Sequence, residues 1–522
     1  MTTLFVPMAG AGDRYRRAGH TRPKPLIDVA GRPMIARVLD AYPGVERVVF
    51  AINREHAETT DLASVLSDLR PNSRIVVCEP HKDGPVRTLL DAADALPDDD
   101  DLLVSYCDFG VEWDFPAFST FIRNRNGAMS AYRGFHPHSL GPTLYAYMRT
   151  DGNRVVEIRE KHHFTRDKLA EWASTGLYWF DSGARAKALA RALIARGERV
   201  QGEFYVSMLM QMLIEQGGDV GVFPVERFFQ WGTAEDLDDW ASWASSLSRL
   251  DEFRRELASV RSCATQLLPM AGLGTRFAAV GYADPKPLIP VAGRPMFAAS
   301  LDTLPKPIAR TVVLRKELAK DERVGAALGA AAPPVTIVAL DTPTEGQACT
   351  VARGLFPDDD DRPVMVTPCD TAYVYDIDRL LAAERAVAKG SAPLVVFAAR
   401  GHLPAIWRPK MYGWMRSDDG QRVQAVAVKE PVPNLPSSEQ WVVTGTFLFG
   451  SGRKLRGAID ALVADDQRVN GEFYVDTIVR RMVESGEDVR IFPVTKYLPF
   501  GTPEELRTFE YWNAVFRGGG TW

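Results

Sequence analysis

The chain has 522 residues, of which 46% are apolar and 25% charged, and this length exceeds what one hydrophobic core supports. Two large domains fit this length best. The net charge of -5 and the pI near 6.0 provide no basic surface for tracking a nucleic-acid backbone, so any nucleotide partner is expected to be a small molecule.

The N-terminus and the cysteines favour a reduced, cytoplasmic setting. The chain opens with a strand-like run at Leu4–Val6, without the basic and apolar segments of a signal peptide. No stretch approaches the roughly 18 to 20 apolar residues that span a bilayer. Five cysteines form no CxxC pair and no zinc spacing: Cys78, Cys107, Cys263, Cys349 and Cys369. We therefore expect reduced thiols, a cytoplasmic location and no membrane span.

A long internal repeat organises the chain. The segment from Pro7 reads PMAGAGDRYRRAGHTRPKPLIDVAGRPM, and the segment from Pro269 reads PMAGLGTRFAAVGYADPKPLIPVAGRPM. Solenoid repeats are about 20 to 50 residues long, so this spacing indicates duplicated domains. We expect copy one at residues 1–248, a linker at 249–264 and copy two at 265–522.

Within each copy, β-rich runs alternate with amphipathic helical stretches. Residues 47–52 and 363–366 are examples of the strand-like runs. Such βαβ alternation predicts an α/β fold in each copy, namely a mainly parallel mixed sheet with helices on both faces.

The residues between the copies predict a helical linker. Apolar side chains recur there at helical spacing: Leu237, Trp240, Trp243, Leu247, Leu250, Phe253, Leu257 and Val260. We expect this helix to pack against copy one, with a dimer interface as the alternative, so homo-oligomerisation stays open.

Both copies carry a glycine-rich loop directly after their first strand. In copy two, Gly272 and Gly274 allow backbone N–H groups to approach phosphate oxygens, and Arg276 can neutralise them. A Pro-Lys-Pro-Leu segment containing Lys286 follows. A short Gly-x-Gly motif alone is a weak signal, whereas this ordered pair of motifs is specific.

This constellation resembles the sugar-phosphate nucleotidyltransferase family, and the resemblance covers nearly all of both copies. It implies a Rossmann-like (GT-A-like) fold and an enzyme that releases pyrophosphate. The implied catalytic residues are Arg276 and Lys286 in copy two, and Arg14 and Lys24 in copy one. The implied nucleotide-binding loop residues are Ala271, Gly272, Gly274 and Thr275, with Ala9, Gly10 and Gly12 in copy one.

The resemblance also implies a Mg²⁺ site at the carboxyl end of the sheet. The strand-end residues Asp108 and Asp370 match the family's metal-ligand position. Many relatives supply a second carboxylate just before a late Gly-Thr pair, where this chain has Gln230 and Pro499. Asp476 is a candidate substitute in copy two; the alternative is a carboxylate that favours the helix dipole.

For the acceptor, the family uses a lysine that holds the sugar-linked phosphate, followed by a glycine. Lys161 with Gly176, and Lys429 with Gly445, match this pattern. The resemblance implies a sugar 1-phosphate or related acceptor, used to activate a building block for a surface polysaccharide or a secondary metabolite. The acceptor's hydroxyl groups are expected to meet Glu203 and Glu472, for which helix capping is the alternative.

The base-reading loop resembles the segments around Gly84 in copy one and around Gly346 and Gln347 in copy two. Five residues before each glycine stand Glu79 and Asp341. A carboxylate that faces the base accepts hydrogen bonds from amino or imino groups, which favours CTP or GTP.

Differences between the copies favour copy two as the catalyst. Copy one has Asp13 in the expected triphosphate loop, Pro85 in place of a backbone donor, and Ser207 where copy two has Asp476. Two active sites of different specificity are an alternative. A nucleotide-sugar-binding or regulatory protein, or a glycosyltransferase, are alternatives from other classes.

Overall fold

The computed structural model describes residues 1–329 and 333–517, which form two compact units, Met1–Ala241 and Ser242–Trp522. Within the described residues, no helix is both long and apolar enough to cross a bilayer. All five cysteines are free thiols.

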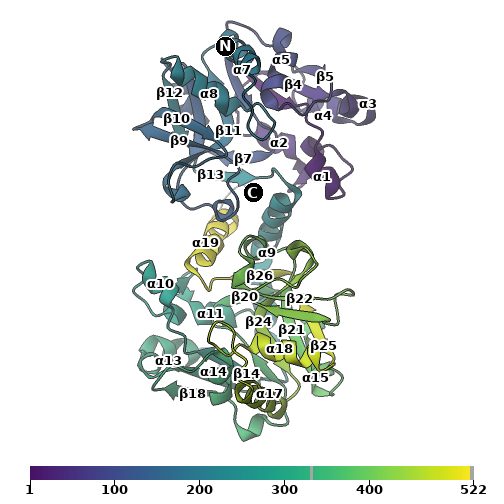
Figure 1. Cartoon of the computed structure of the whole chain (residues 1–522), viewed down its shortest axis with the longest axis vertical. Coiled ribbons are helices and arrows are strands. Elements are labelled where there is room, and N and C mark those ends of the chain that lie inside the picture. Colours follow the sequence, from purple (N-terminus) through teal and green to yellow (C-terminus); the bar gives the residue numbers. More distant parts are fainter. Residues whose placement is uncertain (330–332, 518–522) are drawn as a thin grey trace. The chain divides into compact units, whose positions relative to one another are not determined.

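Unit 1 contains a nine-stranded mixed sheet, with β9, β10 and β12 on one side and β4 and β5 on the other (Figure 1). In spatial order its strands are β5 (Arg74–Cys78), β4 (Arg47–Asn53), β1 (Thr2–Met8), β6 (Asp101–Ser105), β11 (Trp172–Phe180), β8 (Gly127–Tyr132), β12 (Val220–Pro224), β10 (Arg154–Glu160) and β9 (Ala146–Asp151). Two small sheets pair β2 (Asp28–Val29) with β3 (Arg32–Pro33), and β7 (Phe109–Glu112) with β13 (Arg227–Gln230).

The helices of unit 1 cover both faces of this sheet. They are α1 (Asp13–Arg17), α2 (Met34–Leu39), α3 (Arg54–Thr59), α4 (Leu62–Leu69), α5 (Pro85–Asp91), α6 (Phe115–Phe121), α7 (Gly183–Arg196), α8 (Val206–Glu215) and the start of α9 (Ala234–Ser259), with short 3₁₀ helices η1 (Lys24–Leu26), η2 (Ala93–Ala95), η3 (Pro137–Leu140) and η4 (Lys168–Ala170). Because side chains alternate along a strand, Phe5 packs under α5, α7 and α8, whereas Leu4 and Val6 pack under α2, α4 and α6.

Unit 2 repeats this architecture. Its main sheet has the order β18 (Val335–Leu340), β17 (Arg310–Arg315), β14 (Thr265–Met270), β19 (Val364–Val366), β24 (Trp441–Phe449), β21 (Leu394–Ala399) and β25 (Val489–Pro493), with β22 (Gly413–Arg416) on β24 and β23 (Ala425–Val428) on β22. The small sheets pair β15 (Pro290–Val291) with β16 (Arg294–Pro295), and β20 (Thr371–Val374) with β26 (Lys496–Pro499). The strand order matches that of unit 1, as a duplication requires.

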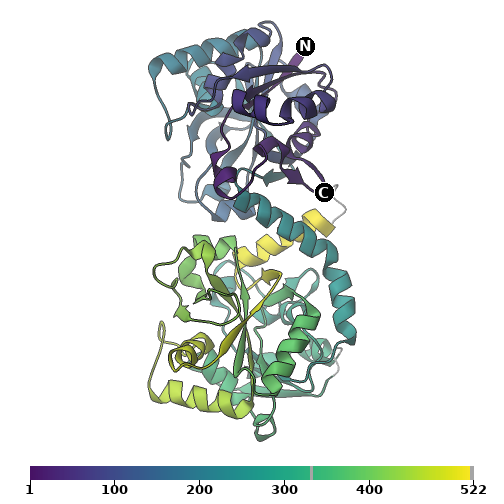
Figure 2. The same cartoon turned by 90° about the vertical axis from the view of Figure 1, so that its right-hand side faces the viewer.

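Helices also cover both faces of the unit 2 sheet, as Figure 2 shows. They are α10 (Thr275–Ala279), α11 (Met296–Leu301), α12 (Lys316–Ala319), α13 (Glu322–Gly329), α14 (Gln347–Arg353), α15 (Ile377–Ala388), α16 (Leu403–Trp407), α17 (Gly452–Ala464), α18 (Val475–Glu484) and α19 (Pro503–Arg517), with η5 (Lys286–Leu288), η6 (Pro357–Asp359), η7 (Pro409–Met411) and η8 (Ser437–Glu439). The predicted fold class is confirmed. Parallel pairing dominates the half from β18 to β19, and the other half is mixed.

The predicted linker is helical through Ser259, the end of α9, but its expected packing is wrong from Trp243 onward. Trp240 packs on Trp231 inside unit 1. Phe253 instead meets Tyr375, with ring centroids 5.0 Å apart, inside unit 2. Apolar periodicity predicts that a helix has a buried face, but it does not identify what covers that face.

The strand order of each sheet creates a crevice at the carboxyl ends of its central parallel strands. In unit 1, β1 lies between β4 and β6, and all three strands run parallel. The chain passes from β1 to β4 and β5 on one side and then returns to β6 on the other side of β1, so the loops after β1 and β6 open a crevice at their carboxyl ends. Unit 2 has the same arrangement after β14 and β19.

Candidate active site

The loop after the first strand of each copy contains two glycines with different structural requirements. Gly12 and Gly274 adopt left-handed backbone angles, with φ of 66° and 65°. A Cβ atom at Gly274 would also lie 2.8 Å from Lys286 Cβ. At Gly272, and likewise at Gly10, a Cβ would meet no protein atom within 4 Å. The left-handed backbone therefore explains the second glycine of each loop, and packing adds a second reason at Gly274. Neither explains the first glycine, which leaves space for an incoming group.

The lysine of each Pro-Lys-Pro-Leu segment binds the strand-end aspartate of its own copy. Lys24 Nζ donates to Asp108 Oδ2 at 2.5 Å and to the Gly232 carbonyl at 3.0 Å. In copy two, Lys286 Nζ forms the same ion pair with Asp370. Burial alone would lower the pKa of Lys286, but its acidic neighbours, with Asp370 foremost, together outweigh burial and the net shift is upward. This lysine therefore remains a cation at the floor of the site.

A second carboxylate lies beside Asp370, and the sequence analysis missed it. Glu505 of α19 accepts a hydrogen bond from the Tyr412 hydroxyl at 2.7 Å. A Cβ at Gly501 would fall 2.7 Å from Asp370 Oδ2 and 3.5 Å from Glu505 Oε2, so the two carboxylates converge on a space that only glycine leaves open. Burial raises the pKa of Glu505; the Tyr412 hydrogen bond lowers it in part and Asp370 raises it further. The signal in the sequence was the acidic pair after Gly501-Thr502.

The matching position in copy one has a different environment. Asp236 is one methylene shorter and accepts hydrogen bonds from Gln230 Nε2 at 2.5 Å and Thr233 Oγ1 at 2.9 Å. His138 Nδ1 lies 3.2 Å from its other oxygen. This carboxylate is therefore engaged in a buried structural network.

The predicted acceptor lysines share an unusual backbone geometry. Lys161 and Lys429 both have positive φ, 54° and 64°. Lys161 Nζ donates to the Tyr205 hydroxyl at 2.5 Å, and Lys429 Nζ donates to the Met411 carbonyl at 2.8 Å. Burial lowers the pKa of each lysine.

The loop arginine and the acceptor lysine influence each other electrostatically in both copies. Charge repulsion from Arg14 contributes to the lowered pKa of Lys161, and Arg276 contributes likewise to that of Lys429. In copy one, Arg14 and Lys161 also line the same cavity, and two cations there favour anionic groups.

Each acceptor lysine also has a carboxylate beside it. Glu160 directly precedes Lys161 in the chain, and burial raises its pKa to about 7 although Ser207 Oγ donates to it at 2.5 Å. In copy two the corresponding carboxylate is Asp476, whose pKa is raised by burial and lowered in part by Lys429. The structure thus places Asp476, a candidate metal ligand from the sequence, at the acceptor lysine. Sequence reasoning did not identify Glu160.

The base-reading loops contact the Gly-Glu-Phe-Tyr segments. A Cβ at Gly84 would lie 2.8 Å from the Phe204 carbonyl oxygen, and one at Gly346 would lie 2.5 Å from the Phe473 nitrogen. Backbone hydrogen bonds join the same segments, with Phe204 N–H donating to the Asp83 carbonyl at 2.8 Å. This attachment places Glu203 and Glu472 next to the loops.

The two carboxylates predicted to face the base are instead in exposed ion pairs. Glu79 pairs with Arg54 at 2.6 Å, and Asp341 pairs with Lys316 at 2.8 Å. Asp13, expected to repel a triphosphate, is partly neutralised by Arg16 at 2.8 Å and Lys82 at 3.2 Å, and these partners lower its pKa.

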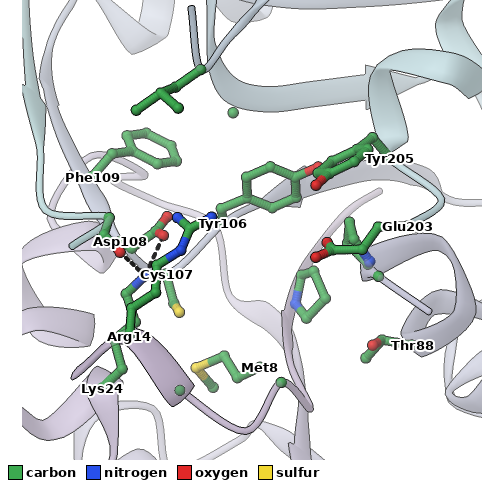
Figure 3. Close-up of a pocket in the computed structure, with 18 of the residues that line it drawn as sticks. Met8, Arg14, Lys24, Thr88, Tyr106, Cys107, Asp108, Phe109, Glu203 and Tyr205 are labelled. Atoms are coloured by element: carbon green, nitrogen blue, oxygen red, sulfur yellow. Dashed lines mark hydrogen bonds and ion pairs between the residues drawn. The ribbon is translucent and has the colours of Figure 1, made fainter. Parts of the chain in front are cut away.

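Copy one contains a cavity of about 590 Å³ that gathers most of its predicted residues. Figure 3 shows Arg14, Lys24 and Asp108 on one side and Glu203 and Tyr205 on the other. The predicted residues that line it are Ala9, Gly10, Gly12, Arg14, Lys24, Gly84, Asp108, Lys161, Gly176 and Glu203. Tyrosine and hydroxyl side chains complete the wall near Lys161: Tyr106, Tyr145, Tyr178, Ser174 and Thr175. Glu79 does not line this cavity.

The chain matches the model of the MobA-like NTP transferase domain at residues 6–112 and 267–432, just over half of its length. It is 27% identical over 226 residues to the bifunctional protein GlmU of Rhizobium etli (strain CIAT 652), covering 42% of this chain and 47% of that protein. It is 29% identical over 227 residues to GlmU of Rhodopseudomonas palustris (strain BisB5), covering 41% and 46%. The chain thus spans about half the length of these curated relatives.

Two solved structures each align with a little under half of the chain. The nucleoside-diphosphate-sugar pyrophosphorylase of Vibrio cholerae RC9 aligns with a TM-score of 0.38 at 20% identity, over 45% of this chain and 98% of that one. The inositol-1-phosphate CTP transferase of T. maritima aligns with a TM-score of 0.36 at 16% identity, over 45% and 91%.

Proposed function

Because the chain belongs to the MobA-like NTP transferase family, whose model matches both copies, we propose that it joins a nucleoside triphosphate to a sugar 1-phosphate or related phosphorylated metabolite. The observation that carries this proposal is the set of cations around one cavity in copy one, Arg14, Lys24 and Lys161. Copy two has the same residue types at the matching positions, Arg276, Lys286 and Lys429. In this proposal the loop arginine binds the triphosphate and the acceptor lysine binds the phosphate group of the acceptor, which brings the two anions together. The glycine at position 272, which packing does not require, leaves space for the triphosphate.

The reaction is an in-line displacement at the α-phosphorus. An oxygen of the acceptor phosphate forms the new P–O bond, the bond from the α-phosphorus to the bridging oxygen breaks, and pyrophosphate leaves with that electron pair. The protein's contribution is to position the two anions and to neutralise their charge. Lys286, a partly buried cation anchored by Asp370, supplies positive charge where negative charge increases in the transition state.

The site of copy two fits a divalent cation. Asp370 and Glu505 would hold Mg²⁺ in the space that Gly501 leaves open. Across the residues that the structure describes, no group of three or more His, Cys, Asp or Glu could hold an ion. Mg²⁺ suits such a site because it is commonly held by one or two carboxylates together with substrate phosphates and water. When bound, it neutralises charge on the phosphate oxygens.

Copy two is the proposed catalyst, since it combines Lys286 with two convergent carboxylates. A second active site in copy one is supported by a specific observation: Arg14, Lys24, Asp108 and Lys161 all line one cavity. The alternatives from other classes predict different outcomes. A binding or regulatory protein releases no pyrophosphate, and a glycosyltransferase consumes a nucleotide sugar.

Pyrophosphate release by the full chain tests the proposal. The assay combines each common nucleoside triphosphate with Mg²⁺ and each of several sugar 1-phosphates and phosphorylated polyols. Release that requires one triphosphate and one acceptor establishes the activity. Nucleotide binding without release for any pair would contradict it. The same panel tests whether CTP or GTP is preferred.

A further inference from the structure

Three positions around the acceptor lysine differ between the copies in a coordinated way. In copy one, Ala146 of β9 pairs with Glu160 of β10, which precedes Lys161. In copy two, Gly413 of β22 pairs with Val428 of β23, which precedes Lys429. The second residue of the neighbouring helix is Ser207 in α8 and Asp476 in α18. The set Ala146, Glu160 and Ser207 therefore corresponds to Gly413, Val428 and Asp476.

The exchange keeps one carboxylate beside each lysine but moves it from the sheet to the helix. In copy one the carboxylate stands on β10, and α8 packs against this strand (Figure 1). In copy two, α18 packs against β23 and supplies the carboxylate itself. The first-strand residue changes with it: a Cβ at Gly413 would lie 2.2 Å from Asp476 Oδ2, so the alanine of copy one would exclude this aspartate.

Helix formation does not account for the aspartate. A first-turn carboxylate favours the helix dipole, but α8 and α18 have the same length and α8 has Ser207 at this position. Asp476 is partly exposed, and an ionised carboxylate offers about four acceptor positions that a ligand can use. In copy one, the cavity around Glu160 is lined by tyrosine and hydroxyl side chains, which suits a polyhydroxylated ligand.

We propose that Asp476 is a specificity-determining residue of copy two, which accepts a hydrogen bond from a hydroxyl group of the acceptor. In copy one the corresponding carboxylate is Glu160, which stands on strand β10 instead of on a helix. The two copies therefore select phosphorylated polyhydroxy compounds that differ in the position or configuration of that hydroxyl group. This inference rests on the proposed function for the identity of the acceptor site.

Binding measurements separate hydroxyl recognition from a general charge effect. Isothermal titration uses the full chain carrying Lys161→Gln, which removes the acceptor lysine of copy one. The probes are glucose 1-phosphate, galactose 1-phosphate, mannose 1-phosphate and inorganic phosphate. Asp476→Asn keeps the size of the side chain, and Glu484→Gln, an exposed residue of the same helix, is the matched control.

We expect Asp476→Asn to weaken binding of the preferred sugar phosphate by about 10- to 100-fold, as for loss of a charged hydrogen bond. Inorganic phosphate should bind equally well or more tightly, because a negative charge has been removed. The full chain carrying Lys429→Gln gives the order of preference of copy one among the three sugar phosphates. The triple variant Gly413→Ala/Val428→Glu/Asp476→Ser, made in the Lys161→Gln chain, should shift the preference of copy two toward that order.

Equal effects on the sugar phosphates and on inorganic phosphate would overturn the proposal, and so would a chain that binds none of the three sugar phosphates. Selective binding of a sugar phosphate without pyrophosphate release would contradict the proposed function and leave this inference intact. Pyrophosphate release with unchanged acceptor selectivity in Asp476→Asn would support the proposed function and contradict this inference.

Discussion

Gly274 lies directly against Lys286, with room for a hydrogen atom but not for a methyl group between the loop and the lysine. The backbone of Gly274 is also left-handed, so two independent constraints require glycine there. Gly272, two residues earlier, has neither a neighbour within 4 Å of its absent Cβ nor a positive φ. This contrast provides a matched pair of variants.

Gly274→Ala should destabilise the fold by about 1–3 kcal/mol, because it adds backbone strain and a steric clash. Gly272→Ala should leave the melting temperature close to that of the wild type and raise the KM for the nucleoside triphosphate about 10-fold or more. Thermal unfolding and pyrophosphate-release kinetics measure both effects. A Gly272→Ala variant with normal KM would mean that the triphosphate does not approach this loop.

Lys286→Ala should lower the rate of pyrophosphate release by about 100-fold or more, because a preorganised cation at the reacting phosphorus is lost. Lys389→Ala, an exposed lysine of the same unit, is the control. Circular dichroism checks that the variant is folded. Near-normal turnover in a folded Lys286→Ala protein would remove this lysine from the reaction.

Lys24→Ala decides the role of copy one. If both sites work, one triphosphate–acceptor pair should lose its pyrophosphate release while another pair keeps it. Unchanged turnover with every active pair would assign copy one a role other than catalysis, and loss of all pairs would contradict independent sites.

Glu505→Gln should weaken Mn²⁺ binding to copy two about 10-fold, because one of two carboxylate ligands becomes neutral while the hydrogen bond from Tyr412 is retained. The measurement is the electron paramagnetic resonance signal of free Mn²⁺ in a titration of the full chain carrying Asp108→Asn, which weakens any site in copy one. Glu504→Gln, the adjacent residue, is the control. Equal Mn²⁺ affinity in both variants would exclude Glu505 as a ligand.

Glu160 makes the stability of the chain depend on pH. Its folded pKa of about 7 is above the unfolded value of 4.5, so its contribution is fully present below pH 4.5 and is lost as the pH rises through 7. The free energy of unfolding of Glu160→Gln, relative to that of the wild type, should therefore be higher at pH 8 than at pH 5 by on the order of 2–3 kcal/mol. Thermal unfolding at both pH values measures the change. The exposed Glu198→Gln should show a constant difference, and a constant difference for Glu160→Gln would contradict the prediction.

The alternation of strand-like and helical segments predicted the fold of each copy. The ion pair of Lys286 with Asp370 was not predicted, but it has a simple physical reason, since the segments that follow neighbouring parallel strands meet at one sheet edge. Local patterns contain no comparable information on how α19 approaches Tyr412, and this contact brings Glu505 to the site.

Spacing alone was a weaker guide at the base-reading loop. The five-residue interval to the glycine singled out Glu79 and Asp341, but neighbouring cations at Arg54 and Lys316 hold these side chains in exposed ion pairs. The sequence singled out Asp476 as a candidate metal ligand. It could not show that Asp476 lies near Lys429, because that proximity depends on the register of β22 and β23. Long-range register is what a single sequence leaves open.

The short distance between Gly413 and Asp476 also restricts the order in which the two copies diverged. From an ancestor like copy one, the alanine methyl had to disappear before an aspartate could enter the helix. From an ancestor like copy two, the aspartate had to leave before a methyl could return. A single substitution in the wrong order places a methyl carbon and a carboxylate oxygen in the same volume. On either route, the intermediate therefore carried glycine at the strand position together with a helix residue other than aspartate.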